Sequence, residues 1–305
     1  MDAAALGVAR SALRLYDAAA TRKALMDFGT EMSNADYHAH EAISKSKLDA
    51  ARKGGRHLWD LLYGPPREST AAFDFGTAVH ALLPGEDFSK IAVCMPAGLK
   101  KTTKEGKAFL AEHEGKIVLN GSDSYALEQM MASMNQHPIS KALFNGELKG
   151  RSELSFFCKD KETGLDCKAR PDFILDDLSL VVDLKTTLDA SLKGFQKSFA
   201  EYRYFVQAAW YLWVIEQSTG RRPEGFCFVA VEKKRPFSVG VYIADQQSID
   251  LGMQHAREDL AKIAEWKANN YYPGYSDRAE YISLPKWMLP KEDTSSNVQP
   301  VTMSY

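Results

Sequence analysis

Apolar residues follow a helical spacing in the first half of the chain and a strand spacing in the second. Before residue 150 they recur every three or four positions, which is typical of helices that bury one face. Ser44 is the expected N-cap of one such helix, and Pro84-Gly85 ends the next. The expected helices cover about 5–28, 44–64, 72–85 and 124–144, and the segment 86–122 is mixed.

From residue 150 apolar and polar residues alternate, which predicts strands. Three strands are expected at about 151–158, 165–175 and 178–187, with turns at Thr163-Gly164 and Asp176-Asp177. A helix, two strands and a last helix are expected at about 194–218, 225–233, 237–244 and 246–270. This order predicts the α/β class, with a mixed central sheet flanked by helices and decorated by N-terminal helices.

The same pattern predicts the domain organisation. We expect a helical extension at 1–36, one domain at 37–284 with its core at about 150–245, and a polar tail at 285–305. No apolar run reaches the roughly 18 residues of a membrane span. The N-terminal segment has an acid at its second position and no apolar core before a cleavage site, so we expect no signal peptide and a cytoplasmic protein.

Composition and charge restrict the function only weakly. The 305 residues are 45% hydrophobic and carry a formal net charge of −2, an ordinary profile for a globular protein. A near-neutral net charge gives no indication of a nucleic-acid-binding protein, but a local basic patch would be sufficient to bind nucleic acid. Four lysines of the mixed segment are grouped closely enough to form a basic cluster: Lys100, Lys101, Lys104 and Lys107.

The cysteines favour no metal cluster. Cys94, Cys158, Cys167 and Cys227 include no C-x-x-C pair, so zinc-ribbon and iron–sulfur spacings are absent. Cys158 and Cys167 flank the turn at 159–166 and are expected to face each other across a hairpin. We expect all four cysteines to be reduced thiols.

Charged residues interrupt the apolar strand predicted at 178–187. In this strand Asp183 and Lys185 share one face with Val181, because side chains alternate between faces. Asp172, on the preceding strand, is expected to lie beside Asp183 through the short turn at 176–179. Burying these charges unpaired would be costly, and carboxylate oxygens are ligands that Mg²⁺ prefers. The alternative is a structural Asp–Lys ion pair at a strand end.

The wider sequence carries a resemblance to known nucleases. Pro171-Asp172 and Asp183-Leu184-Lys185, ten residues apart, resemble the PD-(D/E)xK pattern. Five segments resemble, in order, the nuclease domain of RecE (exonuclease VIII) and its phage and prophage relatives over about residues 37–260. They read GTAVHALL, TGLDCKARPDFIL, VVDLKTT, YRYFVQAAWYLWV and FVAVEKKRPFSVGVY. The resemblance implies a restriction-endonuclease-like core with the site layout that recurs in RecB and AddB.

The resemblance also implies roles for single residues at a metal centre. Asp172 and Asp183 would be its carboxylate ligands, His80 would complete the metal shell, and the backbone carbonyl of Leu184 would be a further ligand. Lys185 would be the catalytic lysine that orients or deprotonates the attacking water. As a bare residue, His80 could equally be a helix-face histidine with no ligand role.

Three more residues match the family's site. Glu153 corresponds to a further acid near the metals, on a strand face that it is expected to share with Ser155 and Phe157. Gln207 and Tyr211 lie one helical turn apart and match the Q-x-x-x-Y motif that supports the lysine and the DNA backbone. A solvated strand face for Glu153, and ordinary helix positions for the other two, remain the alternatives.

Basic residues near the site are the DNA-contact candidates. Arg170 precedes Pro171 and is expected on the same strand face as Asp172, within reach of a phosphate. For each candidate the alternative is a solvated charge. The further candidates are Arg151, Lys168, Lys233, Lys234 and Arg235.

The resemblance implies a double-strand DNA exonuclease that needs Mg²⁺, for which Mn²⁺ would substitute. It would act 5′ to 3′ at duplex ends and leave 3′ single strands for recombination. It would form a homo-oligomeric ring, a trimer or tetramer, and work with a RecT-type annealing protein, without a membrane. The chain departs from the AddB and CRISPR-associated branches, because it lacks the cysteines that hold their iron–sulfur cluster, so we expect no such cluster. The alternatives are another PD-(D/E)xK nuclease, structure-specific or of CRISPR-adaptation type, and a catalytically silent DNA-binding module.

Overall fold

A computed structural model describes residues 29–65, 70–285 and 288. The helix expected at 5–28 and most of the tail at 285–305 therefore lie outside the described residues, and the two predicted boundaries, at 36/37 and 284/285, stay predictions. Among the described residues, no helix is both long and apolar enough to cross a membrane.

The first half is helical, as predicted. Gly54, at a φ of 141°, separates two helices where one was expected over 44–64, because this backbone conformation cannot continue a helix. Ser44 stands at the N-cap position, as expected. The helices are α3 (Asn34–Ala39), α4 (Lys45–Lys53), α5 (Gly55–Tyr63), α6 (Ala71–His80), α7 (Phe88–Ile91), α8 (Lys104–Glu112), α9 (Gly121–Gln136) and α10 (Pro138–Phe144), and the short strands β1 (Ala92–Cys94) and β2 (Ile117–Leu119) pair in parallel between them.

The second half forms the predicted mixed sheet. Its strands are β3 (Gly150–Ser152), β6 (Phe173–Leu175), β7 (Leu180–Thr187), β8 (Gly225–Glu232) and β9 (Val239–Ile243), in the order β3-β6-β7-β8-β9. Only β7 and β8 pair in parallel within this sheet. The remaining elements are the hairpin β4 (Phe156–Lys159) and β5 (Asp166–Ala169) and the helices α11 (Leu192–Glu201), α12 (Tyr204–Thr219) and α13 (Gln246–Ala268).

Two of the predicted strands are wrong as single units. The segment 151–158 divides at Glu153, whose φ of 50° turns the chain out of the main sheet before β4 begins. The segment 165–175 divides at 170–172, where Pro171 lacks the N–H that a ladder needs. Glu153, Ser155 and Phe157 therefore share no strand face, and Arg170 shares none with Asp172. The β4–β5 hairpin does place Cys158 opposite Cys167, as predicted, and both are free thiols.

The helix expected at 194–218 is also two helices. Arg203 adopts a left-handed conformation, with a φ of 54°, between α11 and α12. Its guanidinium pairs with Asp49 of α4 at 2.9 Å and with Asp259 of α13. The break is thus fixed by ion pairs to two other helices, which no local sequence signal reveals.

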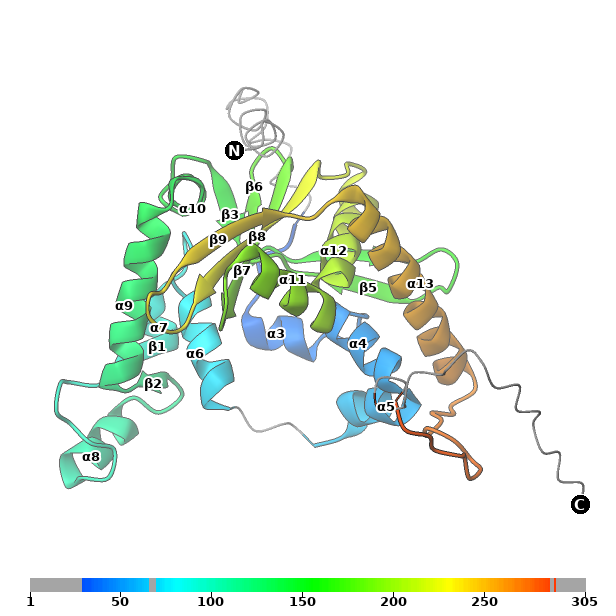
Figure 1. Ribbon diagram of the computed structural model, residues 1–305, viewed down its shortest axis with the longest axis horizontal. Helices are drawn as coiled ribbons and strands as arrows, with labels where there is room; N and C mark the ends of the chain where they lie inside the picture. Colours follow the sequence, from blue (N-terminus) through cyan, green and yellow to red (C-terminus); the bar gives the residue numbers. More distant parts are fainter. Residues whose placement is uncertain (1–28, 66–69, 286–287, 289–305) are drawn as a thin grey trace, which may run out of the picture.

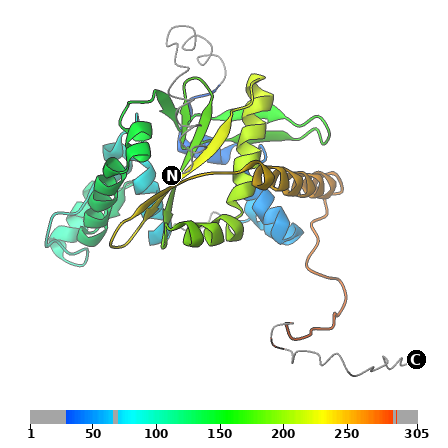
Figure 2. The same cartoon turned by 45° about the horizontal axis from the view of Figure 1, so that its top comes forward.

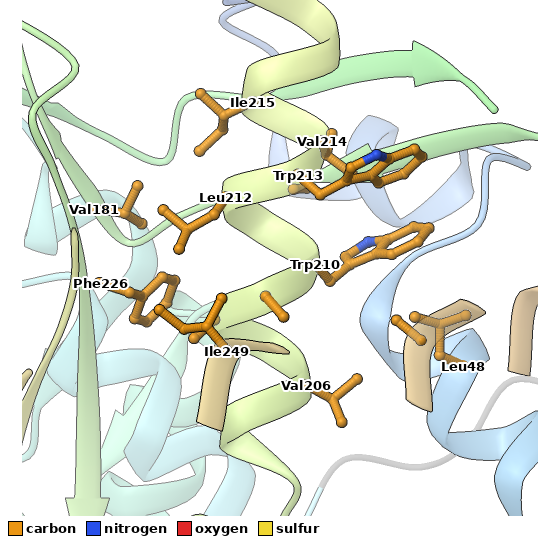
Figure 3. Packing of buried hydrophobic residues seen from close by; sticks show 14 of the residues in the cluster. Leu48, Val181, Val206, Trp210, Leu212, Trp213, Val214, Ile215, Phe226 and Ile249 are labelled. Atoms are coloured by element: carbon orange, nitrogen blue, oxygen red, sulfur yellow. The ribbon is translucent and has the colours of Figure 1, made fainter. Parts of the chain in front are cut away.

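Helices cover both faces of the sheet (Figure 1). β7 shows the division, because Val181 belongs to one apolar core while Leu180, Val182 and Leu184 belong to the other. The second core includes α6, α9 and α10, whereas the first contains α4, α12 and α13. Figure 2 shows α9 and α13 on opposite sides of the sheet. In the first core, Val206, Trp210 and Trp213 of α12 pack with residues of β7, β8, α4 and α13 (Figure 3).

The Arg203 break generates a stability prediction. Asp259 is 0% exposed, so Arg203→Ala would leave a buried carboxylate without its main partner. We expect the free energy of unfolding to fall by about 3 kcal/mol in a denaturant titration. Arg222→Ala, which removes an exposed pair with Glu216, is the matched control and should cost at most about 1 kcal/mol. Equal losses in the two variants would contradict a structural role for the Arg203 pair.

Candidate active site

The β6–β7 register brings two aspartates together. Phe173 pairs with Val182 at the end of the antiparallel ladder, so Asp172 and Asp183 are the next residues in this register. Asp172 Oδ2 accepts a hydrogen bond from the backbone N–H of Leu184 at 2.6 Å. The two carboxylates are only 8% and 1% exposed, respectively. The predicted juxtaposition of these acids is confirmed.

A histidine and a third acid join Asp172. His80 is the last residue of α6, and its Nδ1 lies 3.3 Å from Asp172 Oδ1. Glu153 reaches the same place from the bend after β3. One ligand atom of each of these three residues lies within 4.8 Å of the others, a spacing that suits a metal ion. Asp183 is outside this set of three, although the sequence predicted it as a ligand beside His80 and Asp172.

Asp183 is instead held by Lys185 and Gln207. Lys185 Nζ lies 2.7 Å from Asp183 Oδ2, on the strand face that alternation predicted for both. Gln207 Nε2 donates to Asp183 Oδ1, so the α12 glutamine supports the lysine through the aspartate. Asp183 Oδ2 meets the Lys185 ammonium, and a carboxylate oxygen with one such partner keeps a second lone pair for a cation.

The charges at this site perturb one another. Burial and the Asp172 carboxylate together raise the pKa of Glu153 to about 7 and that of Asp183 to about 6. Burial alone would lower the pKa of His80, but Asp172 outweighs it and raises that pKa to about 9. These directions show negative charge crowded into a poorly solvated place. The donor set, carboxylates with one imidazole, fits a divalent cation such as Mg²⁺ or Mn²⁺.

Two of the acids, Glu153 and Asp172, line a cavity of about 830 Å³. His80 and Tyr211 line it with them, and residues of α3, α6 and α7 form much of the remaining wall. Burial raises the pKa of Tyr211 well above its usual value, so its hydroxyl stays protonated. The two residues of the Q-x-x-x-Y motif thus have different positions, because Gln207 donates to Asp183 whereas Tyr211 lines the cavity. The position of Leu184 is fixed by its N–H, and the ligand role of its carbonyl stays a prediction.

Two predicted DNA contacts have partners within the protein. Lys168 is 2% exposed, and its ammonium donates to the carbonyl oxygens of Tyr37 and of His40. The Arg170 guanidinium donates to Ser155 Oγ and to the Met32 carbonyl, both at 2.8 Å. Lys168 is therefore too deeply buried to meet a duplex phosphate, whereas Arg170 lines the cavity and its contact with a phosphate stays a prediction.

The other basic candidates are absent from the lining of the cavity. Lys234 and Arg235 are exposed in the connection between β8 and β9, with Lys233 half-buried beside them. Arg235 donates to the Tyr125 hydroxyl at 2.6 Å. Arg151 is half-buried in β3. The structure brings none of these four into the lining of the cavity.

Two residues of the site region were missed by sequence reasoning. The Tyr204 ring centroid lies 4.9 Å from Lys185 Nζ, so its π face contacts the ammonium. Its place three residues before Gln207 on the same helix was an available signal. The Tyr37 ring lies 4.3 Å from both Lys168 Nζ and Arg170 Cζ. Nothing in the local sequence around Tyr37 indicates that contact.

Comparison with solved structures supports the fold. The chain aligns over 84% of its length with a candidate exonuclease from Eubacterium rectale, covering 97% of that chain at 14% identity and a TM-score of 0.58. A phage-related exonuclease from Haemophilus somnus 129PT aligns over 82% of this chain and 95% of its own, at 12% identity and a TM-score of 0.37. No match was found among curated proteins.

A family model covers most of the domain. It matches residues 44–285 and describes a PDDEXK-like domain of unknown function (DUF3799). The span contains all the acids, the histidine and the lysine discussed above. The predicted PD-(D/E)xK membership is thereby confirmed, in agreement with the resemblance to RecE-like nucleases. The chain belongs to this PDDEXK-like family.

Proposed function

We propose that the protein is a Mg²⁺-dependent exonuclease that acts on double-stranded DNA. The observation that carries this proposal is the pair of buried carboxylates, Asp172 and Asp183, with Lys185 ion-paired to Asp183 beside the cavity. Family membership supports the phosphodiester chemistry, because the D…D-x-K arrangement gives the PDDEXK-like fold its name. The similarity to the solved candidate exonuclease supports only the fold.

Each residue has a proposed task. His80, Glu153 and Asp172 would hold the cation, with Asp183 adjoining them. Bound Mg²⁺ would neutralise the scissile phosphate and acidify a water. Lys185 would orient the attacking water by donating a hydrogen bond, since Asp183 and Asp172 outweigh burial and raise the pKa of its ammonium. Gln207 fixes Asp183, and Tyr204 confines the ammonium from the other side.

The finer parts of the proposal rest on the resemblance to RecE. They are 5′-to-3′ polarity, 3′ single strands passed to a RecT-type annealing protein, a ring of three or four chains, and a cytoplasmic place of action. Charge supports the ring indirectly, because one chain with a net charge of −2 must hold a polyanion. Repetition around a channel would turn a modest basic patch into a strong one.

Digestion of end-labelled DNA tests the activity. With Mg²⁺, linear duplex should be degraded from its 5′ ends and covalently closed circles should survive, because an exonuclease requires an end. Lys185→Ala and Asp183→Ala should lower the rate by at least about 100-fold while the circular dichroism spectrum is kept. Lys193→Ala, an exposed lysine of α11, is the matched control and should act like wild type.

The outcomes of this digestion separate the alternatives. Rapid linearisation of circles, or preference for flaps, would indicate a structure-specific nuclease. Binding of duplex without cleavage by the wild type would indicate a silent DNA-binding module. Full activity in Lys185→Ala would contradict the site assignment even if DNA were degraded.

Calorimetric titration with Mn²⁺ tests the metal ligands without any nuclease assay. We expect His80→Ala and Asp172→Asn to raise the dissociation constant at least about tenfold, because each removes a donor from the same small site. His57→Ala is the control, since His57 lies on α5 and contacts Tyr275 instead. Wild-type affinity in His80→Ala would show that the cation is held elsewhere.

Light scattering and salt dependence test the assembly. We expect a mass well above the 34.0 kDa of one chain, and duplex affinity that falls steeply with salt concentration as counterions are released. Neutralising the exposed Lys234 and Arg235 together should reduce that salt slope by about two if both meet phosphates. A strictly monomeric enzyme that digests long DNA processively would overturn the ring.

A further inference from the structure

Most glycines inside the helices have a packing reason. A Cβ atom at Gly106 of α8 would lie 1.9 Å from the carbonyl oxygen of Lys100. At Gly252 of α13 it would lie 2.3 Å from the carbonyl oxygen of Phe205, and at Gly194 of α11 only 2.1 Å from the side chain of Asp189. No larger residue fits at these three positions without displacing its neighbours.

At Gly76 no packing contact in the described part of the chain excludes a larger side chain. It is the sixth residue of α6, in the interior of the helix, where glycine is a poor helix former. A Cβ atom there would meet no atom of the described residues within 4 Å. Gly121 also has open space, but it is the first residue of α9, directly after the N-cap. Internal packing therefore does not account for the absence of a side chain at Gly76.

The open space at Gly76 lies in the cavity. Phe73, Gly76, Thr77 and His80 all line it, and their spacing of three and four residues places them on one face of α6. This face leads from an exposed aromatic ring to the metal-ligand set. Phe73 is 66% exposed and lines the cavity, so its ring is accessible to a bound molecule.

We propose that this face of α6 binds an unpaired segment of the substrate strand. The Phe73 ring stacks on a nucleobase, the strand passes over Gly76, and a phosphate of the strand lies beside His80 and Asp172, which would hold the cation. The proposal rests on the proposed nuclease function and adds a binding subsite and its ligand, unpaired nucleotides. Glycine at 76 leaves the room that the strand requires.

Dimensions and chemistry favour this occupant. Phe73 and His80 are seven residues apart, or ~10 Å along the helix axis, roughly the length of three stacked nucleotides. An aromatic face stacks on any unpaired base, whereas a duplex hides its base faces within the stack. Away from its ends, an intact duplex would meet Phe73 only through its sugar and phosphate groups, which gain little from an exposed ring.

Substitution at Gly76 tests the room for the strand. Gly76→Ala should melt at the same temperature as wild type or higher, because the added methyl group finds open space and alanine favours helix. It should bind Mn²⁺ with wild-type affinity, yet its kcat/KM on linear DNA should fall about tenfold, chiefly through KM. Gly121→Ala, with a similar open Cβ position outside the cavity, should retain wild-type kcat/KM.

Substitution at Phe73 tests the stacking. Phe73→Ala should lower kcat/KM about tenfold, and Phe73→Tyr should restore it, because both aromatic rings offer a π face. Wild-type kcat/KM in Gly76→Ala, or equal losses in Phe73→Ala and Phe73→Tyr, would overturn the subsite while leaving the nuclease function intact. Weakened Mn²⁺ binding in Gly76→Ala would also overturn it, since the effect would then act through His80. Failure of wild type to cleave any DNA would instead refute the proposed function on which the subsite rests.

Discussion

The site depends on one short antiparallel register, the pairing of β6 with β7. Because Phe173 pairs with Val182, Asp172 accepts the Leu184 N–H and lies beside Asp183 with almost no exposure to water. A slip of one residue would send Asp183 to the opposite face of β7, into an apolar core. The other site residues arrive from separate elements that pack on this pair of strands, so their geometry follows from the register and does not create it.

Surrounding contacts keep these charges in place without neutralising them. Gln207 donates to Asp183 from α12, and Tyr204 of the same helix contacts the Lys185 ammonium. The start of α12 is itself fixed by Arg203, through ion pairs to α4 and α13. The position of Lys185 therefore depends on α12 and, through Arg203, on the packing of α4 and α13. The excess negative charge, seen in the raised pKa of Glu153 and Asp183, remains available to a cation.

The features that the sequence predicted correctly are those that neighbouring residues in the chain determine. The alternation in β7 correctly placed Asp183 with Lys185, and the Asp176-Asp177 turn correctly placed Asp172 beside them. The breaks at Glu153 and Arg203 were not predicted, because each is stabilised by partners far away in the sequence. The β4–β5 hairpin leaves the main sheet and pairs with residues before α3, at Thr30, and after it, at Ile43. Periodicity within a segment cannot report such a change of partner.

The basic residues beside the acidic motif also have contacts that their local sequence does not indicate. Lys168 and Arg170 stand beside the acidic motif, which made them candidates for phosphate contact, yet their donors are used on the backbone around α3. They are about 130 residues from those carbonyls in sequence. Under the proposed function, contact with the rest of a duplex would come from exposed cations, and Lys100, Lys101, Lys104 and Lys107 on and before α8 are exposed. The proposed catalysis and the proposed DNA contacts would then belong to different parts of the chain.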